Sequence, residues 1–205
     1  MVGGVLREPG IVHHTFAGPT FLGELDGSAS VRVQALASRL EAGGLAAIVS
    51  DDIRSVEWTK VLQVLPAMTL TALTRRPYHE VMSVPELACR FVRLIREAGQ
   101  IAEREGIRLA DWPQMIPVAT IVEATEQRGR QIVMRFGREL LRRGETSVRP
   151  SMLQSIETGR RLEVDAIHGY LVQRAREYGI DVPTLAVTYD LLKGVDRLHA
   201  GEGQE

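Results

Sequence analysis

One short run of the chain carries a lysine in surroundings that could support proton transfer. Between Glu57 and Arg75, Lys60 is the only charged residue, and most of its neighbours are apolar. Apolar surroundings disfavour the ammonium form, so the pKa of such a lysine tends to fall towards the range useful in acid–base catalysis. The alternative is a lysine whose stem is buried and whose amine reaches water, and this run by itself favours that alternative.

A carboxylate in the second half of the chain is the second group that could do chemistry. The pattern predicts a helix over 153–178, and offsets of seven and four place Ile156, Glu163 and Ile167 on one face of it. A carboxylate on an apolar stripe favours a cationic partner, for which Lys60 is a candidate. A local ion pair with Arg160 or Arg161 is the alternative, and it is favoured when these residues are taken alone.

A hydroxyl precedes that predicted helix. Ser151 follows Pro150, so it could cap the helix by accepting hydrogen bonds from free backbone N–H groups of the first turn. A helix N-terminus with a nearby hydroxyl also suits the carboxylate of a substrate. The two interpretations are compatible.

Composition limits the classes of function. The 205 residues carry a net charge of −1, which indicates neither a nucleic-acid nor a membrane partner. A single cysteine, Cys89, cannot form an internal disulfide, so we expect a reducing cytoplasmic location. The five histidines show no metal-ligand spacing, so no metal site is predicted. The arginine-rich stretch over 128–143 is interpreted as a solvated helix face.

The chain divides into two regions of different composition, whose secondary structure must position Lys60, Ser151 and Glu163. Residues 1–50 are rich in glycine and in residues typical of strands. They predict a hairpin of 11–16 with 20–25, a helix over 28–40 that is stopped by Gly43, and a short strand of the buried type over 46–50. Residues 51–199 are predicted to be all-helical and 200–205 to be a frayed tail. The further predicted helices, apart from the one over 153–178, begin with 51–74, which Asp51 or Asp52 would cap and which contains Pro66. They continue with 85–105, which Gly106 would stop, with 114–143 as one or two helices, and with 183–198, which Pro183 would begin.

Several motifs occur in the order typical of one known family. These are Trp58-x-Lys60, Leu70-Thr71-Ala72, Pro150-Ser151-Met152-Leu153-Gln154, Glu163-x-Asp165, Ile167-x-Gly169 and Ile180-x-Val182-Pro183. Over essentially its whole length the chain resembles the ketopantoate reductase (2-dehydropantoate 2-reductase) family. The resemblance implies a mainly α fold: a C-terminal helical domain of the 6-phosphogluconate-dehydrogenase-like type over 51–199, preceded by a partial α/β segment. That segment, 1–50, would be the C-terminal remnant of a nucleotide-binding Rossmann domain.

The resemblance also implies an activity and roles for individual residues. Members of the family reduce ketopantoate with NADPH, so an oxidoreductase acting on a small 2-keto acid is expected. Lys60 matches the lysine that protonates the ketone oxygen, and Glu163 matches the glutamate beside cofactor and substrate. Ser151 matches the serine that contacts the substrate carboxylate. A related 3-hydroxyacid dehydrogenase-like enzyme would also use a lysine, but the block from Ser151 to Glu163 fits it less well.

Three positions depart from the family pattern. The family usually places asparagines one and two turns after the lysine and a third further on, where this chain has Val64, Met68 and Tyr78. Apolar side chains cannot hydrogen-bond a polar substrate. We therefore expect either ketopantoate or a less polar 2-keto acid. The aspartate usual after the Met-Leu-Gln run is Ser155 here.

The nucleotide-binding fingerprint is the largest difference. No G-x-G-x-x-G follows a strand in this sequence, so we expect NADP(H) to bind weakly to the chain alone. We also expect the chain to be incomplete without an N-terminal Rossmann domain, to be inactive when isolated and to leave apolar surface exposed. This predicts a separate nucleotide-binding chain or a homodimer. The alternative function is a non-catalytic helical dimerisation or binding module, which Lys60→Ala would distinguish.

Overall fold

The computed structural model describes residues 2–146 and 148–199, and the chain forms two compact units, Met1–Glu57 and Trp58–Glu205. The chain is mainly α, as predicted, and strands occur in the described part of the first unit only. The frayed tail predicted over 200–205 lies outside the described residues. The two units are described separately below.

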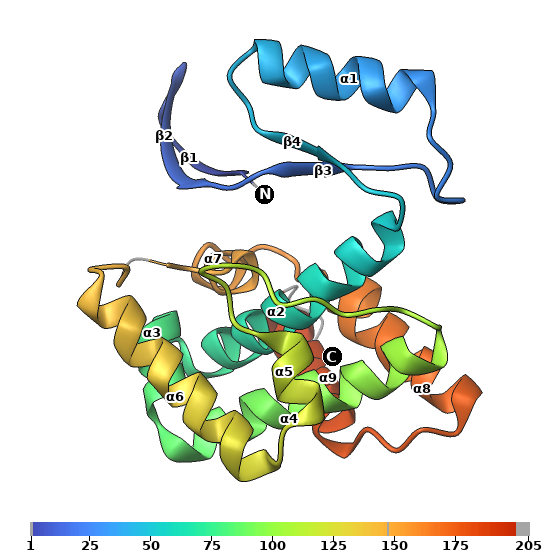
Figure 1. Ribbon diagram of the computed structural model, residues 1–205. Coiled ribbons are helices and arrows are strands. Elements are labelled where there is room, and N and C mark those ends of the chain that lie inside the picture. The colour runs from blue at the N-terminus through green and yellow to red at the C-terminus, as the bar shows by residue number, and fades with distance from the viewer. Residues whose placement is uncertain (1, 147, 200–205) are drawn as a thin grey trace. The chain divides into compact units, whose positions relative to one another are not determined.

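The first unit contains two small sheets. Strands β1 (Val2–Glu8) and β2 (Ile11–Ala17) pair antiparallel, and strands β3 (Thr20–Leu22) and β4 (Ala47–Val49) pair parallel (Figure 1). The predicted hairpin of 11–16 with 20–25 is therefore wrong. Gly10, with φ 85°, closes the tight turn between β1 and β2, so residues 11–16 pair with the preceding strand.

Helix α1 (Val31–Ala42) connects β3 to β4 and completes a β–α–β crossover. Its start is fixed by Ser30, whose hydroxyl accepts a hydrogen bond from Val33 N at 3.2 Å, and it ends at Gly43 as predicted. The prediction that β4 is a buried strand is wrong, because Ile48 is 44% exposed and no further strand covers this pair in the described residues. As expected, the first unit leaves apolar surface exposed.

The second unit is a cluster of helices around α4 (Pro85–Arg104), which packs against helices that precede it and helices that follow it in the chain (Figure 1). Ten residues of α4 are buried, and Gly106 follows its C-terminal end, as predicted. The other helical elements are α2 (Ile53–Thr74), α3 (Tyr78–Ser83), α5 (Val118–Glu123), α6 (Glu126–Arg142), α7 (Ser151–Glu157), the π-helical turn η1 (Asp165–Gly169), α8 (Tyr170–Tyr178) and α9 (Pro183–His199).

Two carboxylates fix the starts of long helices. Asp52 caps α2 by accepting a hydrogen bond from Ser55 N at 3.1 Å, which confirms one of the two predicted caps. Glu97 of α4 is buried and accepts from the N–H groups of Thr184 and Leu185 at 3.1 and 2.7 Å. It therefore caps α9 from a distant part of the sequence and ties α9 to α4.

The single helix predicted over 153–178 is wrong, because the chain leaves the helix after α7. Gly159 takes the left-handed conformation, φ 66°, and Arg160 N donates to Ser155 O at 2.8 Å. This pattern is a helix C-terminus in which glycine avoids the strain that a side chain would cause. Residues 160–163 are irregular, so Glu163 lies before the next helical turn instead of within a helix.

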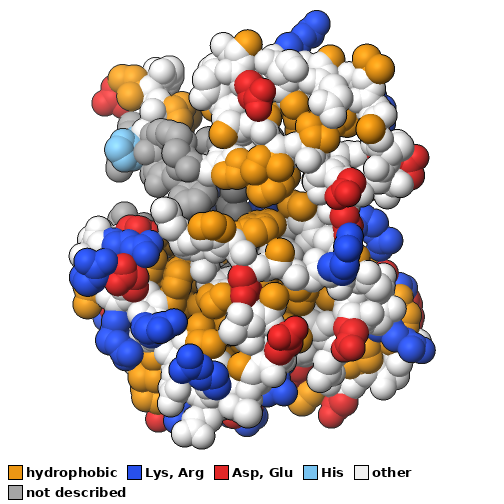
Figure 2. All heavy atoms as spheres, viewed as in Figure 1, with side chains coloured by type: hydrophobic (Ala, Val, Ile, Leu, Met, Phe, Trp, Pro, Cys, Tyr) orange, Lys and Arg blue, Asp and Glu red, His pale blue; other side chains and the backbone are white. Residues whose placement is uncertain are grey.

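The arginine-rich stretch forms the outer face of α6. All six arginines of this stretch are exposed, and Figure 2 shows basic side chains gathered over this helix; they are Arg128, Arg130, Arg135, Arg138, Arg142 and Arg143. Arg142 and Arg143 both form ion pairs with Glu139. The predicted solvated helix face is confirmed. Within the described ranges, no helix is both long enough and apolar enough to cross a membrane.

Candidate functional site

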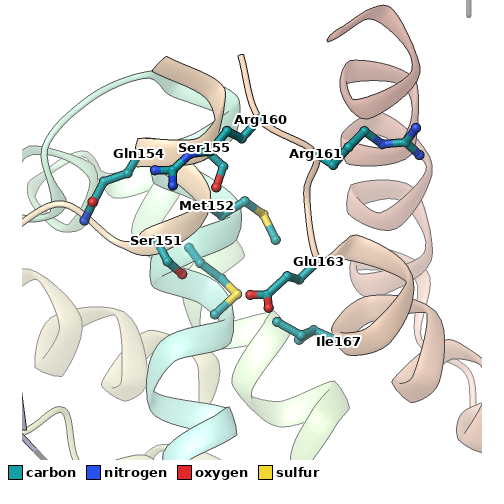
Figure 3. A pocket seen from close by; sticks show the side chains of 9 residues that line it. Ser151, Met152, Gln154, Ser155, Arg160, Arg161, Glu163 and Ile167 are labelled. Atoms are coloured by element: carbon teal, nitrogen blue, oxygen red, sulfur yellow. The ribbon is translucent and has the colours of Figure 1, made fainter. Parts of the chain in front are cut away.

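A pocket of about 450 Å³ in the helical unit brings together side chains from four parts of the chain (Figure 3). Three of the predicted site residues line it: Met68, Ser151 and Glu163. Met68 belongs to α2, Ser151 to α7, and Glu163 to the irregular segment after α7. The remaining lining residues are Met152, Gln154, Ser155, Arg160, Arg161 and Ile167.

Helix α7 forms one wall of the pocket and is held by contacts at both of its ends. Arg149 Nε donates to Glu157 Oε2 at 3.1 Å, and Gln154 Nε2 donates to Arg149 O at 2.7 Å. Ser151 is the first residue of the helix, and Pro150 occupies the cap position, where no side-chain cap hydrogen bond is made. The predicted capping role of Ser151 is therefore wrong, and its hydroxyl lines the pocket instead.

The opposite wall is the segment that carries Glu163, and α9 anchors this segment. Asp196 of α9 is 2% exposed and accepts from Leu162 N at 2.7 Å and from Arg161 Nε at 3.1 Å. Figure 3 shows the Arg161 side chain directed away from the pocket and the Glu163 carboxylate directed into it, on the side of Ser151. The anchor therefore sets which of the neighbouring side chains faces the pocket.

Glu163 forms no ion pair with the partners that the sequence suggested. Arg161 is taken by Asp196, and Arg160 Nε donates to Thr158 Oγ1 at 2.9 Å. Over residues 2–146 and 148–199 there is likewise no ion pair between Glu163 and Lys60. Both expected pairings are thus absent from the described part, and the carboxylate is exposed at the pocket.

Lys60 lies on α2, two helical turns before Met68, and is exposed. The sequence predicted that apolar neighbours would desolvate its amine. The structure shows that these neighbours turn their side chains into the core, while Lys60 is on the solvent side. Lys60 does not line the pocket, and its catalytic role stays a prediction.

The three positions that replace family asparagines differ in their surroundings. Val64 is half-buried one turn after Lys60, whereas Met68 is 7% exposed and lines the pocket. Tyr78 begins α3 and packs against Phe91, with ring centroids 6.1 Å apart, and burial raises the pKa of its phenol. Tyr78 thus joins the core and not the pocket.

A buried histidine lies beside this site, and the sequence had not indicated a role for it. His168 lies in η1, is fully buried, and its Nε2 is 2.7 Å from Thr69 Oγ1. Because the Thr69 hydroxyl donates its one proton to Leu65 O at 2.6 Å, Nε2 must donate to Thr69. Burial lowers the pKa of His168 to about 4, so the ring is neutral and its Nδ1 has no partner in the described structure. Across those same residues, no cluster of His, Cys, Asp and Glu could hold a metal ion.

Comparison with known proteins identifies the family. The family model described as "Ketopantoate reductase PanE/ApbA C terminal" matches residues 52–196. The 2-dehydropantoate 2-reductase of Halobacterium salinarum is 28% identical over 195 residues, which are 95% of this chain and 57% of that protein.

Solved structures agree on the fold. The PanE/ApbA family ketopantoate reductase of Ralstonia eutropha JMP134 superposes with a TM-score of 0.75 at 21% identity, over 98% of this chain and 58% of that one. A D-mandelate dehydrogenase solved with NADH and anilino(oxo)acetate also gives 0.75, at 20% identity, over 98% of this chain and 59% of that one. The chain thus spans little more than half the length of these proteins. Through residues 52–196 it belongs to the ketopantoate reductase PanE/ApbA family, as a chain that carries the family's C-terminal helical domain.

Proposed function

We propose that this chain supplies the substrate-binding and proton-donating half of an NADP(H)-dependent 2-keto acid reductase. The observation that carries the proposal is the pocket, where the Ser151 and Glu163 side chains point towards each other (Figure 3) and the apolar Met68 belongs to the lining. Hydroxyl, carboxylate and apolar surface come from segments far apart in the sequence. Such a combination suits a small molecule with one charged end and one apolar end.

Each polar residue has a role in this proposal. Reduction of a ketone adds a hydride to carbon and a proton to oxygen, and the ammonium group of Lys60 is the proton donor. The Ser151 hydroxyl donates a hydrogen bond to the substrate carboxylate. Glu163, at the other wall of the pocket, would accept a hydrogen bond from the bound cofactor, because a 2-keto acid with a hydrocarbon side chain has no donor of its own. Lys60 is exposed in the chain, so desolvation of its amine requires a bound substrate and a covering partner.

The apolar floor favours a less polar substrate than ketopantoate. Met68 and Met152 are buried and Ile167 is half-buried, and all three line the pocket. None of these three side chains can hydrogen-bond a substrate hydroxyl, so a hydroxyl placed against them carries a penalty. The D-mandelate dehydrogenase that shares this fold was solved with anilino(oxo)acetate, an aromatic ligand. We propose a 2-keto acid with an aliphatic or aromatic side chain.

The described residues do not by themselves fit NADP(H). The first unit has one β–α–β crossover, and its parallel sheet has two strands, without the glycine-rich turn that binds a pyrophosphate. Its apolar surface is exposed, with Val31 at 87% and Leu25 at 77%. These features support a further nucleotide-binding domain or chain that completes the sheet and covers this surface.

Ligand binding by the chain alone tests the pocket. Isothermal titration with 2-oxoisovalerate, phenylglyoxylate and ketopantoate should give tighter binding of the first two. Ser151→Ala should weaken all three about tenfold, the loss of one hydrogen bond to a charged group. Ser38→Ala, which removes an exposed hydroxyl on α1 outside the pocket lining, is the matched control. Tighter binding of ketopantoate would refute the proposed preference.

Turnover in the completed enzyme tests the reaction. Once the nucleotide-binding partner is joined, Lys60→Ala should lower kcat by about 10²- to 10⁴-fold, as expected for the loss of a general acid. Lys193, the only other lysine, is the matched control, since it pairs with Asp165 and does not line the pocket. Full activity of Lys60→Ala would exclude its proposed role.

The exposure of Lys60 favours one alternative, a non-catalytic helical binding module. A module of this kind would retain the fold and the pocket without acid catalysis. In that case Lys60→Ala changes only assembly or stability, and the completed protein shows no 2-keto acid reduction.

A further inference from the structure

Helix α9 presents an apolar stripe to solvent on the face opposite the core. Val187, Leu191 and Leu198 are 59%, 53% and 72% exposed, whereas Leu185, Leu192 and Asp196 on the other face are buried. Spacings of four and seven residues keep the three exposed side chains on one side of the helix. Large apolar side chains in such a row favour burial against another surface.

A glycine lies in the middle of this stripe, at a position where no packing contact within the described residues requires one. Gly194 is exposed, and a Cβ placed on it would meet no atom within 4 Å. Glycine within a helix costs about 1 kcal/mol relative to alanine, so helices seldom carry one for no purpose. A helix crossing, in which another backbone approaches closely, is such a purpose.

Two charged residues flank the stripe. Asp190 and Arg197 are exposed, and the described residues offer neither an ion pair nor a hydrogen bond to their side chains. Both lie on the side of Gly194 away from Leu191 and Leu198, since each residue turns the helix by about 100°.

These residues are arranged symmetrically about Gly194. Leu191 precedes it by three residues and Leu198 follows by four, while Asp190 precedes it by four and Arg197 follows by three. If a second α9 crosses antiparallel at Gly194, each Leu191 lies within about 1.5 Å along the axis of the partner helix's Leu198. Asp190 meets Arg197 across the crossing in the same way. A two-fold axis between the helices keeps leucines with leucines and opposite charges together.

We propose that this face of α9 binds a second copy of the chain, in an antiparallel two-fold crossing centred on Gly194. The interface is isologous, so each apolar and each charged contact occurs twice. One helix face is a small interface, and dissociation in the micromolar range is therefore expected. This surface lies outside the pocket, and the proposal does not depend on the reaction.

Charge reversal tests the pairing. Sedimentation velocity of the 205-residue chain, over a series up to about 100 µM, should show a monomer–dimer equilibrium. Asp190→Arg and Arg197→Asp should each raise the dissociation constant about tenfold or more, because two symmetric pairs become repulsive at once. The double variant, D190R with R197D, should restore dimerisation. Arg176→Asp, an exposed reversal on α8, is the matched control and should have no effect.

A cross-link tests the position of the axis independently. Helices in close contact lie about 8–10 Å apart, which places the two Gly194 Cα atoms roughly 4–5 Å from each other. That spacing suits a disulfide. Gly194→Cys in a Cys89→Ser background should therefore form covalent dimers on mild oxidation, and Arg176→Cys in the same background should not. A chain that stays monomeric over the whole series overturns the proposal, as does a dimer that neither reversal weakens or that the double variant fails to restore.

Discussion

Asp196 connects the fold to the pocket, so replacing it tests whether the anchor on α9 holds the segment that carries Glu163. Its carboxylate is 2% exposed and accepts a hydrogen bond from Leu162 N at 2.7 Å. In Asp196→Ala this buried N–H loses a charged acceptor, which costs about 3 kcal/mol. The ion pair with Arg161 adds little, at most about 1 kcal/mol, because the Arg161 side chain is 58% exposed.

Urea unfolding followed by circular dichroism measures these differences. With an m-value of about 2 kcal/mol/M, the loss in Asp196→Ala shifts the midpoint down by about 1.5 M. Asp196→Asn keeps an acceptor for Leu162 N and should lose about half as much. Arg161→Ala should shift the midpoint by less than about 0.5 M. Asp181→Ala, an exposed aspartate shortly before α9, is the matched control.

The relative losses of stability in these variants distinguish the backbone hydrogen bond from the ion pair. If Arg161→Ala destabilises as much as Asp196→Ala, the ion pair and not the backbone hydrogen bond holds the segment. An unchanged midpoint in Asp196→Ala would show that the segment is not anchored there. If the anchor holds, Asp196→Ala should also weaken 2-keto acid binding more than Arg161→Ala does, because only the former frees the backbone next to Glu163.

Four further substitutions have defined outcomes. The pKa of His168 is lowered to about 4 in the folded chain from a usual value of 6.5, so its stabilising effect is complete above pH ~6.5 and is lost as the pH falls towards 4. Urea midpoints should show a loss of up to about 3 kcal/mol over that range, and His168→Gln should flatten it. Gly99→Ala should destabilise by about 1–3 kcal/mol in thermal melts, because the new Cβ would lie 2.6 Å from Val122 Cγ2. Gly194→Ala, on an open helix face, should not destabilise the monomer. Met68→Asn should shift binding towards ketopantoate by about tenfold in titrations, since it adds an amide to the apolar floor.

The sequence alone determined the elements that local chemistry specifies. Asp52 as a cap of α2, Gly43 and Gly106 as helix ends, and Pro85 and Pro183 as first helical residues were all predicted correctly. Each of these signals acts within a few residues, so it can be read without knowledge of distant contacts. The family was also recognisable from the order of its motifs.

The tertiary structure decided what depends on distant partners. The sequence could not show that residues 11–16 pair with the preceding strand, β1. The turn at Pro9-Gly10 and the turn at Gly18-Pro19 were both compatible with the strand pattern. The Gly159 break was misread because the apolar periodicity continues on both sides of it.

The site shows the same division. Ser151, Met68 and Glu163 were nominated from motifs, but their meeting in one pocket depends on Asp196 and α7, which no local pattern connects. The exposure of Lys60 was decided in the same way, because burial is set by which face of α2 the surrounding helices cover. Local signals fix where helices begin and end, whereas packing between distant segments fixes which side chains they bring together.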